Sequence, residues 1–464
     1  MLNMAHESQD GLEWEHTLFN IIPHWTREPS ISAIEKVSRQ ELEIPPEDPC
    51  HVSFYASGAF NKLYRVDYAG QSSLMRVTLP VYPHHKTHGE VTTLRWLGDN
   101  TSVPVPKVLA FDDSRDNEIG FEWILMELMP GLSAYQRWRM MTMEQKQLMV
   151  KRMAEIQAEL FYYGKLYLAF KDIGTLHTHT AEEVADMPTA VTPGTIVAHE
   201  FFIGDRVKYD VPRGPFHSSH DWLESLLKVV ILEQKAAFEK AEDDEDREGA
   251  EEVIATARRL LSIFPRIFPE AQEIAAQPTV LWHDDLNLRN ILVDEKGDIT
   301  AIVDWECVTT VPVWMTANMP KFLQGTSRSE EPTRNWYADE TPSELAASVN
   351  GDDPLQLDNE GKCSSYWRHR MEYEVTQLRE VYKKRLTELW PEWPSQNDTV
   401  KANFYEVVIQ CSDGLFTRMI NKWIDRFESG KMIGWDELLE EVQQPVIYGQ
   451  ESSEPQPDSA LDAN

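Results

Sequence analysis

The chain has 464 residues, of which 77 are acidic and 44 basic, giving a formal net charge of −33. Such a charge repels the phosphates of nucleic acids and anionic membranes, so we expect neither as a partner, whereas it would favour a cationic substrate. The 42% hydrophobic content is ample for a core, and the length allows two or three domains.

The cysteines and the N-terminal residues bear on the cellular compartment. Four cysteines lie far apart without a C-x-x-C pair, so neither a disulfide framework nor a zinc site is predicted from them. The first twenty residues carry acids and lack the apolar stretch of a signal peptide, and no run approaches a membrane span. We therefore expect a reduced, soluble, cytoplasmic protein.

The chain opens with a segment that we expect to be a helical N-terminal extension, residues 1–50. It contains Trp14, Ile22 and Trp25, followed by apolar residues at helical spacing over 31–42. Prolines after residue 44 end this pattern. The pattern does not indicate what the extension does.

Three alternating segments follow, at 51–55, 62–67 and 73–78, and predict an antiparallel meander. A loop at 56–61 joins the first two, and an ordinary hairpin turn would explain it by itself. His84, His85 and His88 come next, with i, i+4 spacing of the outer pair. No further ligand with matched spacing appears, so metal binding there is not the favoured interpretation.

The most informative stretch covers residues 281–306. It contains His283-x-Asp285, then Asn290 five positions after that aspartate and Asp304 nineteen after it, each near short apolar runs. The pattern predicts a catalytic loop, a strand, a turn at 295–298 and a second strand ending in an aspartate. A turn with two solvated aspartates is the alternative, which the full spaced set disfavours.

The residue types in this stretch suit phosphoryl transfer, which needs an acceptor hydroxyl held in line and cations on the phosphate oxygens. Asp285 can orient the hydroxyl and take its proton. Asn290 and Asp304 offer hard oxygen ligands for Mg²⁺. We expect His283 to brace the loop by hydrogen bonding.

His-Asp-Asp-Leu-x-x-x-Asn followed by Ile-Val-Asp-Trp-Glu resembles the catalytic motif and metal aspartate of the aminoglycoside phosphotransferase and choline kinase-like family. The resemblance implies an α+β, bilobal protein-kinase-like fold, with a small antiparallel-sheet N-lobe and a larger, mainly helical C-lobe. It also implies ATP and Mg²⁺ as cofactors, Asp285 as the base, and Asn290 and Asp304 as metal ligands.

The same resemblance assigns nucleotide contacts to the N-lobe. Arg76 stands where the family usually has a lysine that clamps the phosphates, and Glu90 resembles that lysine's partner. Arginine is not interchangeable with lysine, and an exposed strand arginine paired with any nearby acid is the alternative. The apolar strand at 121–129 resembles the hinge that meets the adenine. The expected cofactor-binding residues are Ser57, Gly58, Phe60, Asn61, Arg76, Glu90, Glu127 and Met129.

We expect a nucleotide-binding N-lobe at 51–129, a catalytic and acceptor-binding C-lobe at 130–448, and a disordered acidic tail at 449–464. Within the C-lobe, helical patterns cover 142–160, 253–264 (ended by Pro265), 366–390 and 402–427, and a polar surface insertion covers 326–362.

The predicted function is ATP-dependent phosphorylation of a hydroxyl on a small molecule whose identity, like the oligomeric state, is not predicted. The main alternative is a catalytically weak or inactive kinase-like protein that binds nucleotide or a protein partner, motivated by Arg76. A protein kinase would need Asp-Phe-Gly and a glycine-rich G-x-G-x-x-G loop, and a metal-dependent hydrolase a motif such as H-E-x-x-H. The sequence has none of these.

Overall fold

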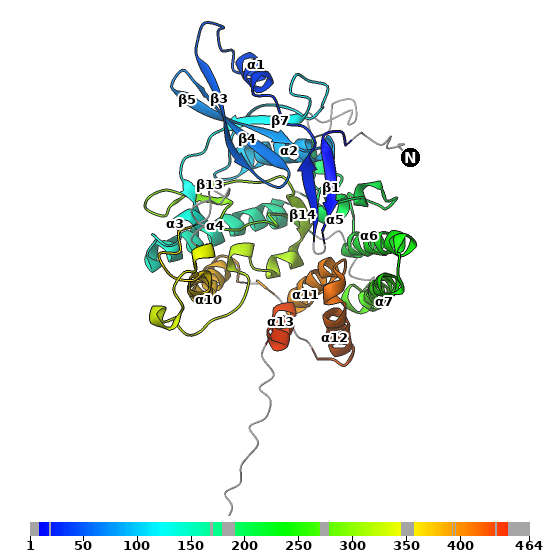
Figure 1. Ribbon diagram of the computed structural model, residues 1–464. Helices are drawn as coiled ribbons and strands as arrows, with labels where there is room; N and C mark the ends of the chain where they lie inside the picture. Colours follow the sequence, from blue (N-terminus) through cyan, green and yellow to red (C-terminus); the bar gives the residue numbers. More distant parts are fainter. Residues whose placement is uncertain are drawn as a thin grey trace, which may run out of the picture.

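The computed structural model describes residues 9–17, 20–167, 170–178, 191–269, 278–344, 357–391, 393–394, 396–431 and 434–443. A twisted sheet lies at one end of the molecule and most of the helices lie at the other (Figure 1). Within the described residues, no helix is long and apolar enough to cross a membrane.

The N-terminal segment is only partly helical. β1 (Leu12–His16) and β2 (Ile21–Trp25) form an antiparallel hairpin, and α1 (Ile31–Glu41) follows, with the Ser30 side chain accepting a hydrogen bond from the Ala33 N–H. The predicted helix at 31–42 is confirmed, but the prediction of helix for the residues before it is wrong. Partial burial alternates along both strands, so their inward side chains pack with a period of two.

One five-stranded antiparallel sheet forms the first lobe, in the order β3-β4-β5-β7-β6. Its strands are β3 (Cys50–Ser57), β4 (Asn61–Tyr68), β5 (Gln71–Thr78), β6 (Val108–Asp112) and β7 (Glu122–Glu127). The predicted meander is therefore confirmed. Helix α2 (His85–Asn100) connects β5 to β6 and contacts both β6 and β7.

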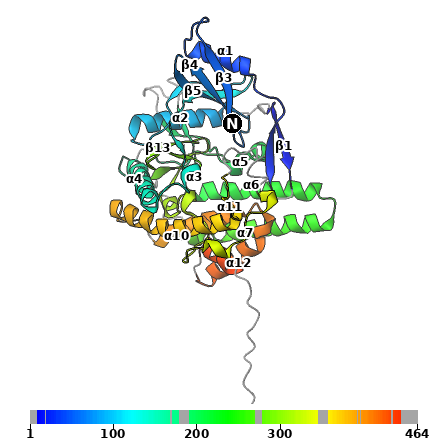
Figure 2. The ribbon, with the colours of Figure 1, turned by 60° about the vertical axis from the view of Figure 1, so that its left-hand side comes forward.

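The second lobe is mainly helical, and α6, α7, α10 and α11 lie beneath the sheet lobe (Figure 2). Its elements up to the catalytic strands are β8 (Leu132–Ser133), α3 (Ala134–Arg137), α4 (Met143–Tyr167), β9 (Leu176–Thr178), β10 (Val191–Pro193), α5 (His199–Phe202), η1 (Arg206–Lys208), α6 (Ser219–Lys240) and α7 (Asp244–Ile267). Those after them are η2 (Val313–Ala317), η3 (Lys321–Leu323), η4 (Arg334–Trp336), α10 (Ser364–Leu389), α11 (Gln396–Gln410), η5 (Gly414–Phe416), α12 (Thr417–Glu428) and α13 (Trp435–Gln443).

Two predicted helix boundaries in this lobe are wrong. α7 does not end at Pro265 but continues to Ile267; it also includes the charged segment from Asp244, where Asp243 accepts the Asp246 N–H and caps the helix. The helical pattern at 402–427 is divided by η5, where Asp413 accepts the Leu415 N–H. The acidic tail and residues 345–356 of the polar insertion lie outside the described residues.

Three short strands carry the predicted catalytic stretch, and a fourth strand after it pairs with the first. β11 (Thr279–Trp282) pairs with β14 (Thr309–Pro312), and β12 (Ile291–Val293) pairs with β13 (Ile299–Ile302) and with β8. The predicted order of loop, strand, turn and strand is confirmed. A small antiparallel-sheet lobe followed by a larger helical lobe also confirms the predicted α+β, kinase-like fold class.

Candidate active site

His283 stands at the base of the loop that follows β11. Its Nε2 lies 3.1 Å from the Val303 carbonyl oxygen, and its ring packs against Trp305 with centroids 4.8 Å apart. Burial lowers the pKa of His283, which keeps the ring neutral. The imidazole therefore braces the loop that carries Asp285 against the backbone just before Asp304, as predicted.

Asp285 is held in place by amides from its own loop. The Asn290 side-chain N–H donates to the Asp285 carbonyl at 2.8 Å and to its Oδ2 at 3.1 Å, and Asn287 donates to the same Oδ2 at 3.0 Å. Lys321 donates to Oδ1 at 3.3 Å from the start of η3. The Asp285 side chain is still 45% exposed, so a substrate can reach its carboxylate.

Asp304 lies directly after β13 with φ at +68°, a left-handed conformation that is uncommon for a residue with a Cβ. Arg76 donates through Nη2 to Asp304 Oδ1 at 3.0 Å, through the same nitrogen to Glu306, and through Nη1 to Glu90 at 2.8 Å. One guanidinium on β5 thus joins α2 to the segment 304–306.

Lys86, which sequence analysis did not identify, completes this arrangement from the first turn of α2. Its ammonium pairs with Glu306 and donates to Asn61 Oδ1 at 3.1 Å, while Asn61 Nδ2 donates to Glu306 at 2.7 Å. Lys86 precedes Glu90 by four residues and so shares its helix face, a spacing that could have revealed it. We refer to Arg76, Lys86, Glu90, Asp304 and Glu306 as the cleft network.

Burial and charge act in opposite directions on the carboxylates of the cleft network. Desolvation, reinforced by Glu306, raises the pKa of Glu90 to about 7 against the effect of Arg76. The pKa of Asp304 is also raised by desolvation and by Glu306. Desolvation would raise the pKa of Glu306 too, but Lys86 and Arg76 outweigh it and lower that pKa. The three carboxylates face only two cations, which favours an additional cation.

A cavity of about 270 Å³ opens between the catalytic loop and the 58–61 turn. Five predicted site residues line it: Gly58, Phe60, Asn61, Asp285 and Asp304. Its other walls include aromatic side chains and acids that were not predicted as site residues: Trp222, Trp282, Tyr405, Glu200 and Asp284. The cavity thus combines the carboxylates of Asp285 and Asp304 with a mixed aromatic and acidic surface.

The remaining predicted residues do not line this cavity. Arg76 and Glu90 are buried behind it in the cleft network, and Asn290 supports Asp285. Ser57, Glu127 and Met129 are not in its lining. The Glu127 N–H donates to the Lys107 carbonyl at 3.0 Å, so it is already used within the sheet lobe.

All the predicted site residues, from Ser57 to Asp304, fall within the match to a known family model, the phosphotransferase enzyme family APH. The match covers residues 51–315. The match exceeds half of the 464 residues. The chain belongs to this family.

The relatives that match this chain are distant. A subtelomeric hrmA-associated cluster protein of Aspergillus fumigatus is 26% identical over 60% of this chain and 61% of its own length. The mitochondrial protein "Altered inheritance of mitochondria protein 9" of Scheffersomyces stipitis is 24% identical over 51% of this chain and 42% of its own. The chain thus spans about three fifths or less of these relatives.

Solved structures of aminoglycoside phosphotransferases also align with this structure. APH(4)-Ia matches with a TM-score of 0.43 and 13% identity over 87% of this chain and all of that chain. The ternary complex of APH(2″)-IIa with streptomycin and ATP matches with a TM-score of 0.40 and 11% identity, over 87% of this chain and 98% of that one.

The side chains of this phosphotransferase-family site fit a magnesium ion. The Asn290 amide nitrogen faces Asp285, which leaves its oxygen as a ligand. Arg76 bonds Oδ1 of Asp304, and no described residue bonds Oδ2. Carboxylate and amide oxygens are the protein ligands that Mg²⁺ uses, with water and phosphate completing its shell.

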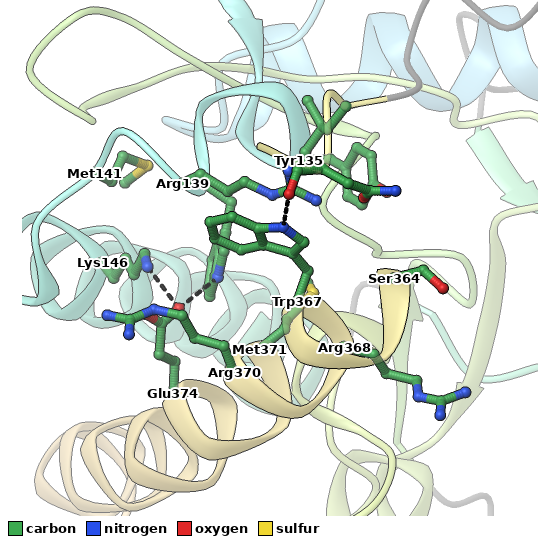
Figure 3. A pocket seen from close by; sticks show the side chains of 13 residues that line it. Tyr135, Arg139, Met141, Lys146, Ser364, Trp367, Arg368, Arg370, Met371 and Glu374 are labelled. Atoms are coloured by element: carbon green, nitrogen blue, oxygen red, sulfur yellow. Dashed lines mark hydrogen bonds and ion pairs between the residues drawn. The ribbon is translucent and has the colours of Figure 1, made fainter. Parts of the chain in front are cut away.

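A second cavity, of about 430 Å³, lies between α3, the start of α4 and the start of α10 (Figure 3). At its floor Lys146 pairs with Glu374 at 2.6 Å, and the Trp138 indole donates to the same Glu374 oxygen at 2.8 Å. Arg370 pairs with the other Glu374 oxygen at 3.3 Å. None of the predicted site residues lines this cavity, and we refer to Lys146 and Glu374 as the α4–α10 pair.

Proposed function

We propose that the protein is an ATP-dependent kinase that phosphorylates a hydroxyl of a small molecule. The observation that carries the proposal is that Asp285 and Asp304, from two different loops, open onto one cavity backed by Arg76 and Lys86. A proton acceptor and a metal-binding carboxylate at one cavity are what hydroxyl phosphorylation requires. In this proposal residues 51–129 bind the nucleotide and 130–448 provide the catalytic and acceptor sites.

Each residue then has a defined task. Asp285 orients the acceptor hydroxyl and takes its proton, while Asn290 fixes the Asp285 carboxylate. Asn290 and Asp304 would hold Mg²⁺, which neutralises phosphate charge when bound. Ser57, Gly58, Phe60 and Asn61 would cover the nucleotide phosphates, with Arg76 and Glu90 positioned beneath them. The backbone near Glu127 and Met129 would meet the adenine.

The walls of the cavity favour a cationic acceptor with an apolar portion. Trp222 and Tyr405 pack together with ring centroids 5.2 Å apart, and Glu200 and Asp284 add negative charge beside them. Aromatic faces and carboxylates together attract ammonium groups. Amino sugars and choline-like alcohols have this combination of hydroxyl and cation.

One observation favours the alternative of a weak or inactive kinase-like protein. Arg76 already pairs with Oδ1 of Asp304, which leaves only Oδ2 of that carboxylate for a metal ion. A lysine at this strand position would present a single ammonium instead of a two-armed fork. In the alternative, nucleotide would bind without phosphoryl transfer.

The test is transfer of labelled γ-phosphate from ATP to a panel of hydroxylated amines that includes choline, hygromycin B and streptomycin. We expect Mg²⁺-dependent labelling of at least one acceptor, reduced about 100- to 10,000-fold in Asp285→Asn. His217→Ala, a change at an exposed histidine paired with Asp172, is the matched control and should retain activity. ATP binding without labelling of any acceptor, and without ATP hydrolysis above the Asp285→Asn level, would favour the inactive alternative.

A further inference from the structure

The side chains of His84, His88 and Asp113, which are of metal-ligating types, lie close together at the start of α2, outside the cleft network. Asp113, from just after β6, places Oδ2 3.0 Å from Nδ1 of His84 and 3.0 Å from Nδ1 of His88. Their ligand atoms all lie within 4.8 Å of one another. The sequence shows the histidine pair, but only the fold brings in Asp113.

The distances suit a first-row transition metal. Two ligands bound tetrahedrally at about 2.0–2.1 Å from zinc lie roughly 3.3 Å apart, so contacts of 3.0 Å need only a few tenths of an ångström of movement. His88 lies in the first turn of α2 and His84 immediately precedes the helix, and both rings contact the Asp113 carboxylate. Imidazole nitrogen with carboxylate oxygen favours Zn²⁺, Co²⁺ or Ni²⁺ over Mg²⁺.

The backbone at His84 is held in an uncommon conformation that directs its ring to this point. His84 has φ +62°, and its N–H donates to the Glu122 carboxylate at 2.7 Å. A left-handed conformation is unfavourable for a residue with a Cβ and persists where surrounding contacts fix it. Here the Glu122 carboxylate fixes the backbone of His84, while the Asp113 carboxylate contacts the His84 imidazole.

An open cavity of about 690 Å³ gives an ion a route to this point. Both His84 and Asp113 line it, together with Glu122, Asp116 and Asp10. Arg27 and Arg115 are the cations in its lining. With four carboxylates against two guanidiniums, the cavity attracts a divalent cation toward His84 and Asp113.

We propose that His84, His88 and Asp113 bind one divalent transition-metal ion of the zinc class, with water completing its coordination. His88 Nε2 faces the Thr178 N–H at 3.4 Å, a long contact that is given up when Nδ1 coordinates and Nε2 carries the proton. The ion fixes the first turn of α2 against the connection between β6 and β7. That turn also carries Lys86, so the metal site steadies one end of the cleft network.

The test is titration of tag-free, chelator-treated full-length protein with Co²⁺, followed by visible absorption and by the bound-metal stoichiometry. We expect the protein to bind one equivalent of Co²⁺ and Zn²⁺ to displace it. Both His88→Ala and Asp113→Asn should lose this binding. Circular dichroism and melting temperature establish that these variants fold. The use of two different ligand variants keeps the result interpretable if one of them is unstable.

Two control variants separate this site from other candidates. His220→Ala removes the histidine of the other His/acid cluster, formed with Asp221 and Glu224, and should leave Co²⁺ binding unchanged. Asp304→Ala removes the catalytic metal carboxylate and should leave it unchanged as well. Absence of Co²⁺ binding by the wild type, binding that survives in folded His88→Ala, or binding lost in either control would overturn the proposal.

Discussion

The cleft network and the α4–α10 pair both bury opposite charges, but they differ in what surrounds them. In the α4–α10 pair, both Glu374 oxygens have partners and both charged side chains are buried. In the cleft network, Arg76 Nε and Glu90 Oε2 are buried without hydrogen-bond partners, and Asp304 is 35% exposed to the cavity. The α4–α10 pair is closed in the sense that both carboxylate oxygens are occupied, whereas the cleft network keeps unpaired buried atoms beside an exposed carboxylate.

The largest expected effect comes from breaking the closed pair. Glu374→Leu leaves Lys146 buried without its carboxylate, so we expect the free energy of unfolding to fall by about 3–5 kcal/mol. Urea unfolding measures this, and nucleotide binding should persist while the variant is folded. Lys146→Met combined with Glu374→Leu should recover most of the loss, since no buried charge is left unpaired. A single variant as stable as the wild type would contradict a structural role for the pair.

A smaller effect is expected from shortening the fork in the cleft network. Arg76→Lys keeps one charge but cannot reach Glu90 and Asp304 together, so Mg²⁺–ATP affinity should fall about tenfold, or ~1.4 kcal/mol. Isothermal calorimetry measures the affinity. Arg65→Lys, at an exposed β4 arginine paired with Asp67, is the matched control and should bind like the wild type. Equal loss in both variants would mean that the effect is not specific to the cleft.

A third effect is a change in how stability depends on pH. Since the pKa of Glu90 is raised from 4.5 to about 7, the folded state keeps a proton that the unfolded chain has released in this interval. The stabilisation from this group is fully present below pH 4.5 and is lost as the pH rises through about 7. Glu90→Gln removes it, so the wild-type advantage in unfolding free energy should shrink between these pH values. An advantage that grows with pH would show that Arg76 keeps Glu90 ionised.

The elements predicted from the sequence are those in which apolar residues recur at a regular period, or in which the motif residues lie close together along the chain. The meander, the hinge strand and the 281–306 stretch are of this kind. Lys86 escaped attention because a lysine on a helix face is normally solvated, whereas here it is 1% exposed beneath Glu306. Lys321 and Asp113 reach their partners only through the fold, which local spacing does not encode. The hairpin at 12–25 was missed because the helical spacing over 31–42 was extended to the residues before it.

The central claim is that the cleft network binds nucleotide through Mg²⁺ at Asp304. The most direct test is the thermal shift produced by ATP with and without Mg²⁺, in the wild type and in Asp304→Ala. At ~100 times the dissociation constant, a ligand specific to the folded state adds about 2.7 kcal/mol, which a melting curve resolves. We expect a Mg²⁺-dependent shift in the wild type that Asp304→Ala loses. An unchanged melting temperature of the wild type at millimolar Mg²⁺–ATP, or an equal shift in Asp304→Ala, would contradict the claim.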